Sequence, residues 1–308
     1  RKRPDPCWKL EHGNRKYVLL MLKGKVDMHN IELITDARCI VGESPLWDDR
    51  NDRLLMVDIQ GKRMRSISWG DGSINEVVLP QQAGFLVLGS KGEILAGAED
   101  GVYEIIGSEM RAVSKPTPLK GARFNDGRVG PDGMLYLGTF SRDYSAAFYR
   151  MDPHGNLTEL FDGVGNSNGL DWDVNLGKFY YNDTPLGRTD SFDFGTDGTL
   201  TNRCEFFRYV GGGPDGMTID SNGNLWTAVW GSGSVVCINS RTGKMVDKID
   251  LPVSQPSSCT FAGADLKTLV ITSAAHNIHL KDEPLAGATF AVRPGVQGIT
   301  SNRIRLEV

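Results

Sequence analysis

The segment GPDGMTID, residues 213–220, determines how this sequence is interpreted, because related segments recur along the chain. The others are VGESPLWD at 41–48, QQAGFLVL at 81–88, RFNDGRVG at 123–130, NSNGLDWD at 166–173 and QPSSCTFA at 255–262. Their central residues are separated by 42, 43, 42, 47 and 42 positions and are Gly42, Gly84, Gly127, Gly169, Gly216 and Ser258. A repeat at one period along a whole chain indicates copies of one structural unit.

Each repeat contains several short strand patterns separated by turn residues. A second apolar run follows each central segment, as in residues 54–57, 134–137 and 224–227. Turn pairs such as Lys91-Gly92 and Asn222-Gly223 lie between runs, as they do in β-hairpins. A period of about 40–50 residues with several strands per unit is typical of a propeller blade. We therefore predict an all-β fold, a six-bladed β-propeller with a central metal site.

Two β-sandwiches are an alternative fold, but they do not require one repeat phase along the chain.

The two ends of the chain indicate how the ring of blades closes. Residues 31–39 and 304–308 both have strand patterns, and we expect them to pair within one blade. Residues 1–27 carry eight lysines and arginines against three acidic residues. We interpret 1–27 as a basic N-terminal extension, peripheral or disordered, and 28–308 as the propeller.

Composition excludes several classes of protein. A net charge of −4 over 308 residues argues against a broad nucleic-acid-binding surface. No apolar run approaches the roughly 20 residues of a membrane helix. The five cysteines are scattered and form no Cys-x-x-Cys pair, which argues against a disulfide scaffold or a thiolate metal site. We expect a cytoplasmic protein without nucleic-acid or membrane partners, whose oligomeric state the sequence leaves open.

Polar residues share one phase of the repeat. In a propeller the innermost strands surround a channel, so Glu43, Asn168 and Asp215 are expected to converge there. Asp-Gly and Asn-Gly pairs also form ordinary turns, but three such residues at one phase favour a site for one divalent ion. Buried carboxylates need a neutralising partner. Oxygen ligands suit Ca²⁺, Mg²⁺ or Mn²⁺, and Zn²⁺ or Fe²⁺ fits where coordination stays open to water.

The sequence resembles the family of gluconolactonase, regucalcin and luciferin-regenerating enzyme. The segments that carry the resemblance appear in the family's order between residues 33 and 308: GESPLW at 42–47, RFNDG at 123–127, NGLDW at 168–172, PDGMTID at 214–220 and TSA at 272–274. The resemblance implies a six-bladed propeller with one axial metal ion, often a sugar-lactone hydrolase.

The resemblance also implies roles for particular residues. The metal ligands would be Glu43, Asn168 and Asp215, and Arg123 and Asn125 would bind the substrate. Asp143 lies near the position of an acidic residue that contacts the sugar in some members. The sequence around it, Ser141-Arg142-Asp143-Tyr144, differs from the usual sequence of the family.

The expected reaction is the opening of a sugar lactone to the sugar acid. We expect Asp215 to accept a proton from the attacking water and Arg123 to offer a fixed donor fork. The alternatives are a related metal propeller that hydrolyses esters or organophosphates, and a non-catalytic calcium-binding propeller. His276 and His279 are interpreted as a solvated loop, and Trp230 as a residue that can line the mouth of the channel.

Overall fold

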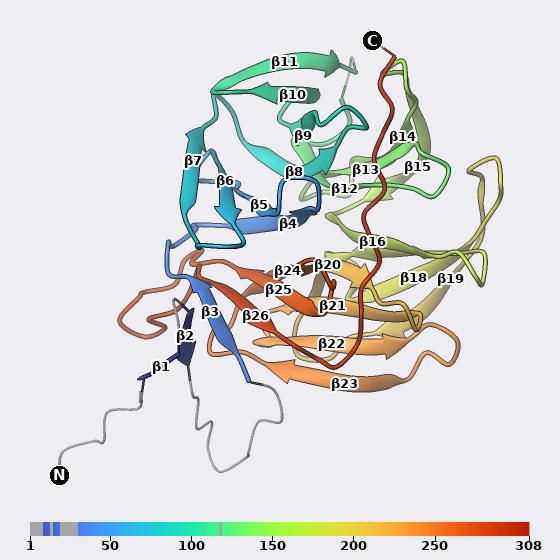
Figure 1. Cartoon of the computed structure of the whole chain (residues 1–308). Helices are drawn as coiled ribbons and strands as arrows, with labels where there is room; N and C mark the ends of the chain where they lie inside the picture. The colour runs from blue at the N-terminus through green and yellow to red at the C-terminus, as the bar shows by residue number, and fades with distance from the viewer. Residues whose placement is uncertain (1–8, 13–14, 19–29, 117–118, 308) are drawn as a thin grey trace.

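The computed structural model describes residues 9–12, 15–18, 30–116 and 119–307. It is an all-β propeller, and the predicted number of six blades is confirmed (Figure 1). The innermost strands are β4 (Gly42–Asp48), β8 (Ala83–Leu88), β12 (Arg123–Val129), β16 (Ser167–Asp173), β20 (Gly213–Ile219) and β24 (Pro256–Ala262). Each innermost strand contacts the next, and β24 contacts β4, which closes the ring around a channel.

The remaining strands follow outwards from the channel in antiparallel order. The second strands are β5 (Arg53–Asp58), β9 (Ile94–Ala98), β13 (Leu135–Phe140), β17 (Lys178–Asp183), β21 (Asn224–Trp230) and β25 (Thr268–Ser273). The third strands are β6 (Arg63–Ser68), β10 (Val102–Ile106), β14 (Ala146–Met151), β18 (Arg188–Phe194), β22 (Ser234–Asn239) and β26 (Thr289–Val292). The outer strands of the first five blades are β7 (Ile74–Val78), β11 (Glu109–Ser114), β15 (Leu157–Val164), β19 (Leu200–Arg208) and β23 (Met245–Asp250).

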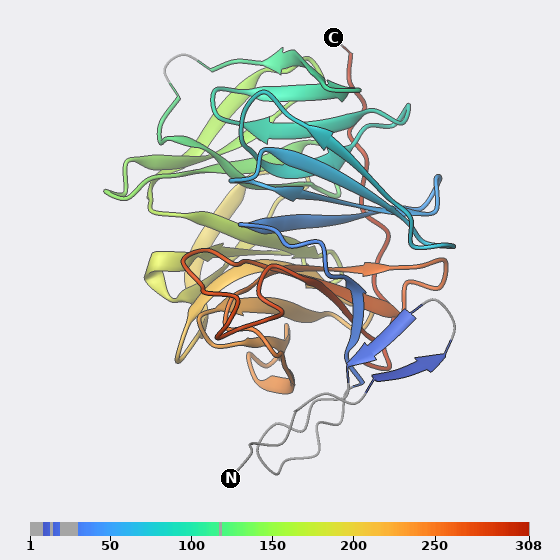
Figure 2. The same cartoon turned by 90° about the vertical axis from the view of Figure 1, so that its left-hand side faces the viewer.

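The sixth blade joins the two parts of the chain that close the ring. Its fourth strand is β3 (Glu32–Thr35), which pairs antiparallel with β26 through Phe290 opposite Leu33 and Ala291 opposite Glu32. Beyond β3 the sheet continues into β2 (Arg15–Val18) and β1 (Lys9–His12), seen at the lower right of Figure 2. The remainder of the extension expected at 1–27 lies outside the described residues.

The prediction that residues 304–308 pair with residues 31–39 is wrong. After β26, Pro294 has no N–H for strand pairing and Gly295 has a φ of +83°. The chain then crosses the ring as an extended segment, residues 293–307, which we call the C-terminal strap. The strap is the dark red trace in front of the blades in Figure 1. Ile304 forms only an isolated parallel bridge, with Gly89 of the second blade.

Large apolar side chains fill the spaces between neighbouring blades. Trp47, Trp172 and Trp226 are buried, with exposed fractions of 5%, 4% and 2%. Trp172 packs against Tyr136 and Phe179 with ring centroids 5.1 Å and 5.0 Å apart. Aromatic contacts of this kind make each blade depend on its neighbour.

The described residues include four cysteines and one short 3-10 turn. Cys39, Cys204, Cys237 and Cys259 are free thiols. The short 3-10 turn η1 (Thr184–Leu186) follows β17. Within the described ranges, no helix has the length and hydrophobicity needed to cross a membrane.

Every innermost strand contains a β-bulge at the phase of the repeat. The register with the second strand shifts between Glu43 and Leu46 in β4, and between Asn168 and Leu170 in β16. Corresponding shifts occur in β8, β12, β20 and β24. A bulge bends a strand and redirects its side chains. The repeated sequence signal therefore marks the place where each blade turns side chains toward the channel.

Glycine at this phase allows neighbouring innermost strands to approach closely. A Cβ atom at Gly169 would lie 2.5 Å from the carbonyl oxygen of Asp215, and one at Gly84 would lie 2.4 Å from that of Phe124. These distances leave no space for a side chain. The periodic glycines are thus required by the close approach of neighbouring blades.

Candidate active site at the mouth of the channel

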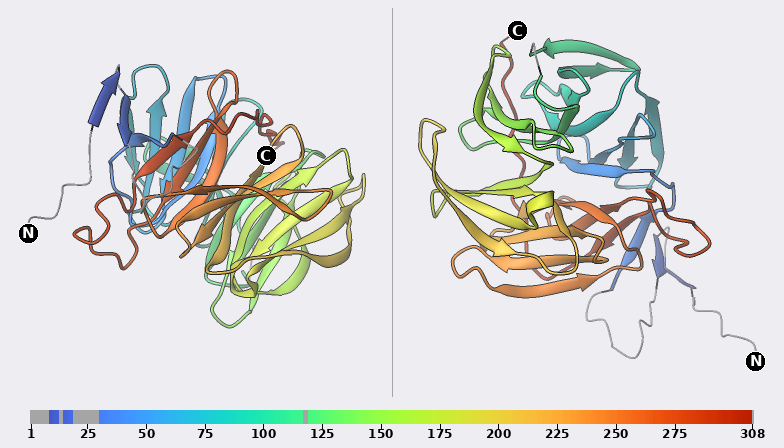
Figure 3. Two further views of the ribbon diagram at one scale, coloured as in Figure 1. Left: turned by 90° about the horizontal axis from the view of Figure 1, so that it is seen from below. Right: turned by 180° about the vertical axis from the view of Figure 1, so that it is seen from behind.

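Four of the predicted site residues lie near the start of an innermost strand. We call the face of the propeller where these strands begin the mouth of the channel, and the opposite face the floor. Glu43 is on β4, Asn125 on β12, Asn168 on β16 and Asp215 on β20. Their exposed fractions are 9%, 8%, 3% and 4%. Arg123, at the start of β12, is half-buried. Figure 3 (right) views the molecule from behind, on the face opposite the strap.

Hydrogen bonds join Arg123, Asn125 and Asn168 into one chain. Arg123 Nη1 donates to Asn125 Oδ1 at 2.6 Å and to the carbonyl of Phe124 at 3.0 Å. Asn125 Nδ2 donates to Asn168 Oδ1 at 3.1 Å and to the carbonyl of Ser167 at 2.7 Å. Both ends of the Asn125 side chain are therefore used, and its contacts fix the positions of Arg123 and Asn168.

Thr184 determines which way the Asn168 carboxamide points. Asn168 Nδ2 lies 2.6 Å from Thr184 Oγ1, and that hydroxyl donates its proton to the carbonyl of Pro214 at 2.8 Å. Because the hydroxyl proton is already used, Thr184 can only accept from Asn168. A flipped carboxamide would place two acceptors against each other. Asn168 Oδ1 is consequently held toward β12 and the channel.

The carboxylates at the mouth raise one another's pKa. Burial raises the pKa of Glu43 from 4.5 to about 8, and the charge of Asp126 adds to the shift. Burial also raises the pKa of Asp215 well above its usual value, with further contributions from Glu43 and Asp126. Burial lowers the pKa of Arg123, while the charges of Glu43, Asp215 and Glu99 oppose that shift. The mouth therefore concentrates negative charge that one arginine does not balance.

This arrangement fits a divalent cation bound between the blades. Glu43 and Asp215 make no ion pair in the part of the chain that the structure describes. A bound cation would stabilise both carboxylates in their charged form. The described residues contain no group of three or more His, Cys, Asp or Glu in metal-binding geometry. The expected set differs from such a group because it combines two carboxylates with the carboxamide oxygen of Asn168.

Asp143 lies apart from these residues. It is exposed in the loop between β13 and β14, which opens at the mouth, and it accepts a hydrogen bond from the backbone N–H of Ser145 at 3.2 Å. Hydrogen bonds from Ser145 lower the pKa of Asp143. No contact with Arg123 or Asn125 is seen among the described residues. A role for Asp143 in substrate binding stays a prediction.

Sequence reasoning missed three contributors to the mouth. Asp126 follows Asn125 on β12, burial raises its pKa to about 6, and its charge raises the pKa of both Glu43 and Asp215. Glu99, in the turn between β9 and β10, acts on Arg123 through its charge. Thr184 follows β17 and orients Asn168. Asp126 adjoins the repeat signal, whereas Glu99 and Thr184 lie in turns that no repeat marks.

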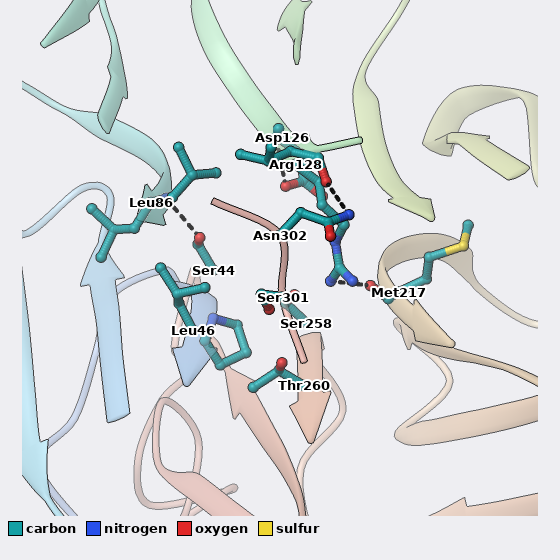
Figure 4. Close-up of a pocket in the computed structure, with 14 residues that line it drawn as sticks. Ser44, Leu46, Leu86, Asp126, Arg128, Met217, Ser258, Thr260, Ser301 and Asn302 are labelled. Atoms are coloured by element: carbon teal, nitrogen blue, oxygen red, sulfur yellow. Dashed lines mark hydrogen bonds between the residues drawn. The ribbon is translucent and has the colours of Figure 1, made fainter. Parts of the chain in front are cut away.

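The C-terminal strap lies across the floor of the channel. Ser301 and Asn302 pass between the innermost strands, and Asn302 Nδ2 donates to the carbonyl of Val129 at 3.2 Å (Figure 4). The cavity that they cover measures about 30 Å³ and is also lined by Ser44, Asp126 and other residues. A cavity of this size admits one or two water molecules. Among the described residues, the strap thus leaves only a small cavity on this part of the channel axis.

A second charged group lies near the floor. Arg128 forms an ion pair with Asp171, and its Nη2 donates to the carbonyl of Met217 at 3.0 Å. The Asp171 carboxylate also accepts the backbone N–H of Ile219 at 3.0 Å. These contacts link the third, fourth and fifth blades and neutralise Asp171.

The fold and the acidic mouth define a class, that of six-bladed β-propellers with a polar site on the channel axis. Comparison with known proteins assigns the chain within that class. A model of the SMP-30/gluconolactonase/LRE-like region matches residues 41–275, and the chain belongs to this family.

Relatives and solved structures agree with this assignment. The chain is 35% identical over 289 residues to regucalcin of Danio rerio, covering 87% of this chain and 96% of that protein. It is 34% identical over 271 residues to 6-deoxy-6-sulfogluconolactonase of Pseudomonas putida, covering 84% and 93%. The structure of luciferin-regenerating enzyme superposes with a TM-score of 0.82 at 25% identity, covering 90% of this chain and all of that one.

Proposed function

We propose that this protein is a metal-dependent lactonase that opens a sugar lactone to the sugar acid. The observation that carries the proposal is the convergence of two buried carboxylates, Glu43 and Asp215, beside Arg123 at one mouth of the channel. The match to the gluconolactonase family and to a sulfogluconolactonase supports the reaction class. The sulfogluconolactonase relative also supports a small-molecule substrate.

Glu43, Asn168 and Asp215 would hold one divalent ion. The oxygen donors suit Ca²⁺, Mg²⁺ or Mn²⁺, and Zn²⁺ or Fe²⁺ is compatible with an incomplete protein ligand set. When bound, such an ion polarises the lactone carbonyl and lowers the pKa of water.

Asp215 is the proposed general base. Its carboxylate is buried and faces other acidic groups, so its pKa is high for an aspartate. A base with a raised pKa accepts a proton more readily from water. The carboxylate would take the proton of the attacking water as the carbon–oxygen bond to the carbonyl forms. The ring oxygen then leaves as the acyl–oxygen bond breaks, and it takes up a proton to become the hydroxyl of the sugar acid.

Arg123 is the proposed substrate-binding donor, and Asn125 positions it. Nη1 of Arg123 is fixed by Asn125 and by the carbonyl of Phe124. In the described part of the chain, Nη2 and Nε of Arg123 donate no hydrogen bond, and the guanidinium carbon lies 5.5 Å from the centroid of the Phe140 ring. The rigid guanidinium can therefore direct its remaining N–H groups to hydroxyl or carbonyl oxygens of the lactone.

The test is hydrolysis of a panel of five- and six-membered aldonolactones by wild-type protein, with and without a chelator. We expect acid release that is lost with EDTA and restored by one of the five candidate ions. Asp215→Asn is expected to lose most turnover, whereas Asp250→Asn, which changes an exposed carboxylate on β23, should retain it.

Two outcomes would contradict the proposal and favour the alternatives. Turnover of esters or phosphotriesters without lactone opening would indicate the related hydrolase. The regucalcin relative raises the second alternative, a calcium-binding propeller without turnover. Tight calcium binding together with no hydrolysis of any lactone would indicate that role.

A further inference from the structure

A second group of side chains gathers at the mouth, on the side away from Arg123. His276 lies in the loop 274–288 between β25 and β26, and it is half-buried rather than fully solvated. Its ring centroid lies 6.5 Å from that of Trp230 on β21, with an interplanar angle of 54°. Its Nδ1 lies 3.3 Å from Gln60 Oε1. Side chains of the fifth, sixth and first blades therefore meet at one place.

Strand register places this group beside both predicted carboxylate ligands. Trp230 pairs with Gly213, two residues before Asp215 on β20. Ala274, two residues before His276, bridges Val41, which lies two residues before Glu43. In a ring of six blades, the sixth blade stands opposite the third, which carries Arg123. A molecule bound on the channel axis would thus have Arg123 on one side and the Trp230–His276 pair on the other.

The hydrogen bonds of His276 define the character of this surface. Asn277 Nδ2 lies 3.1 Å from His276 Nε2, and an amide nitrogen can only donate. Nε2 is therefore an acceptor, and Nδ1 carries the proton that faces Gln60 Oε1. Asn277 is exposed and has a φ of +57°, so a substrate hydroxyl can replace its amide at Nε2 without leaving a buried group unpaired.

We propose that Trp230 and His276 form a substrate-binding wall that selects lactones with hydroxyl groups on the ring. This inference rests on the proposed lactonase function and specifies its substrate. The indole of Trp230 packs against the C–H face of the ring, as aromatic side chains pack against apolar surface. His276 Nε2 accepts a hydrogen bond from a ring hydroxyl. An unsubstituted lactone can use the first contact but not the second.

The experiment compares glucono-δ-lactone with δ-valerolactone, which has the same ring size and no hydroxyl groups. His276→Phe keeps an aromatic ring and removes the acceptor. We expect it to lower kcat/KM for glucono-δ-lactone by about tenfold, the effect of one hydrogen bond, and to leave δ-valerolactone within about twofold. Trp230→Leu is expected to raise KM for both lactones by about tenfold with a smaller change in kcat, and Trp230→Phe should restore part of the loss.

His279→Phe is the matched control, because His279 lies in the same loop and is exposed. Among the residues that the structure describes, it takes part in hydrogen bonds only through its backbone carbonyl. Thermal unfolding of each variant verifies that it is folded. An unchanged ratio of the two kcat/KM values in His276→Phe, with wild-type KM values in both Trp230 variants, overturns the wall while leaving the lactonase function in place. A wild-type protein that opens neither lactone nor any aldonolactone overturns both.

Discussion

Replacing Thr184 by valine tests whether the orientation of Asn168 matters for cation binding. Valine has nearly the shape of threonine but neither accepts from Asn168 Nδ2 nor donates to the carbonyl of Pro214. The substitution removes two hydrogen bonds, one of 2.6 Å from Asn168 Nδ2 to Thr184 Oγ1 and one of 2.8 Å from Thr184 Oγ1 to the Pro214 carbonyl. The carboxamide of Asn168 would then be free to rotate, and its oxygen would no longer be held toward the channel.

The size of the effect follows from those two contacts. Each hydrogen bond contributes about 1 kcal/mol net, and unpaired groups add to the cost, so we expect a loss of about 2–3 kcal/mol in the free energy of unfolding. A residue that orients a metal ligand typically changes affinity by about 10- to 100-fold. We expect Thr184→Val to weaken cation binding within that range.

Calorimetric titration with Ca²⁺ or Mn²⁺ measures the affinity, and urea unfolding without metal measures the stability. Thr242→Val is the control, because the Thr242 hydroxyl donates to Asn239 Oδ1 at 3.1 Å in an exposed turn at the floor. If Thr184→Val binds the cation as tightly as wild type while losing the expected stability, Asn168 is not a ligand whose orientation matters, and the reasoning fails.

Three further predictions concern charge, the strap and the arginine. Without metal, protein stability should fall as pH rises from about 4.5 to about 8, because the raised pKa of Glu43 means that the folded state holds a proton that the unfolded state releases. Thermal unfolding in EDTA at several pH values should show this fall. Ca²⁺ should raise Tm more at pH 8 than at pH 5. Ile304→Ala should reduce the free energy of unfolding by about 2–5 kcal/mol, because Ile304 is fully buried between blades; urea unfolding beside the exposed control Arg305→Ala measures it. Arg123→Lys should lower kcat/KM for lactones by about tenfold or more while leaving cation affinity unchanged, because lysine lacks the donor fork; an unchanged kcat/KM would contradict the role given to Arg123.

The sequence predicts the propeller well because one physical requirement repeats in every blade. Neighbouring innermost strands approach closely enough at Gly84 and Gly169 that a Cβ atom has no space. A bulge at the same phase bends each strand. The period of the glycines therefore records the geometry of the ring, and it remains visible although the rest of each repeat varies.

Closure of the ring was predicted only in part, for an equally physical reason. The strand pattern of residues 304–308 reflects burial of Ile304 and Leu306, which alternate as they would in a strand. In the structure these side chains belong to the strap and pack against the second and third blades, and the Ile304 N–H donates to the carbonyl of Leu88 at 3.1 Å. Alternation of burial does not distinguish a strand within a sheet from a single extended segment across several blades.

The sequence likewise predicts some residues of the candidate site and not others. Glu43, Asn168 and Asp215 follow from the repeat, since they lie at the bulges. The residues that orient or surround them do not. Thr184 belongs to a short 3-10 turn, and His276 belongs to a loop, so neither occupies a repeated position. Their roles depend on which blades are neighbours, which only the closed ring determines.

The distribution of charge along the channel indicates where a cation would bind. Near the floor, Asp171 is paired with Arg128, so that carboxylate is already neutralised by the protein. At the mouth, Glu43 and Asp215 face the single guanidinium of Arg123, whose hydrogen-bond partners among the described residues are Asn125 and the carbonyl of Phe124. Two buried acidic regions in one channel thus differ in whether the chain supplies the balancing charge. Because an unbalanced buried carboxylate is costly, the mouth gains more from a divalent ion than the floor does.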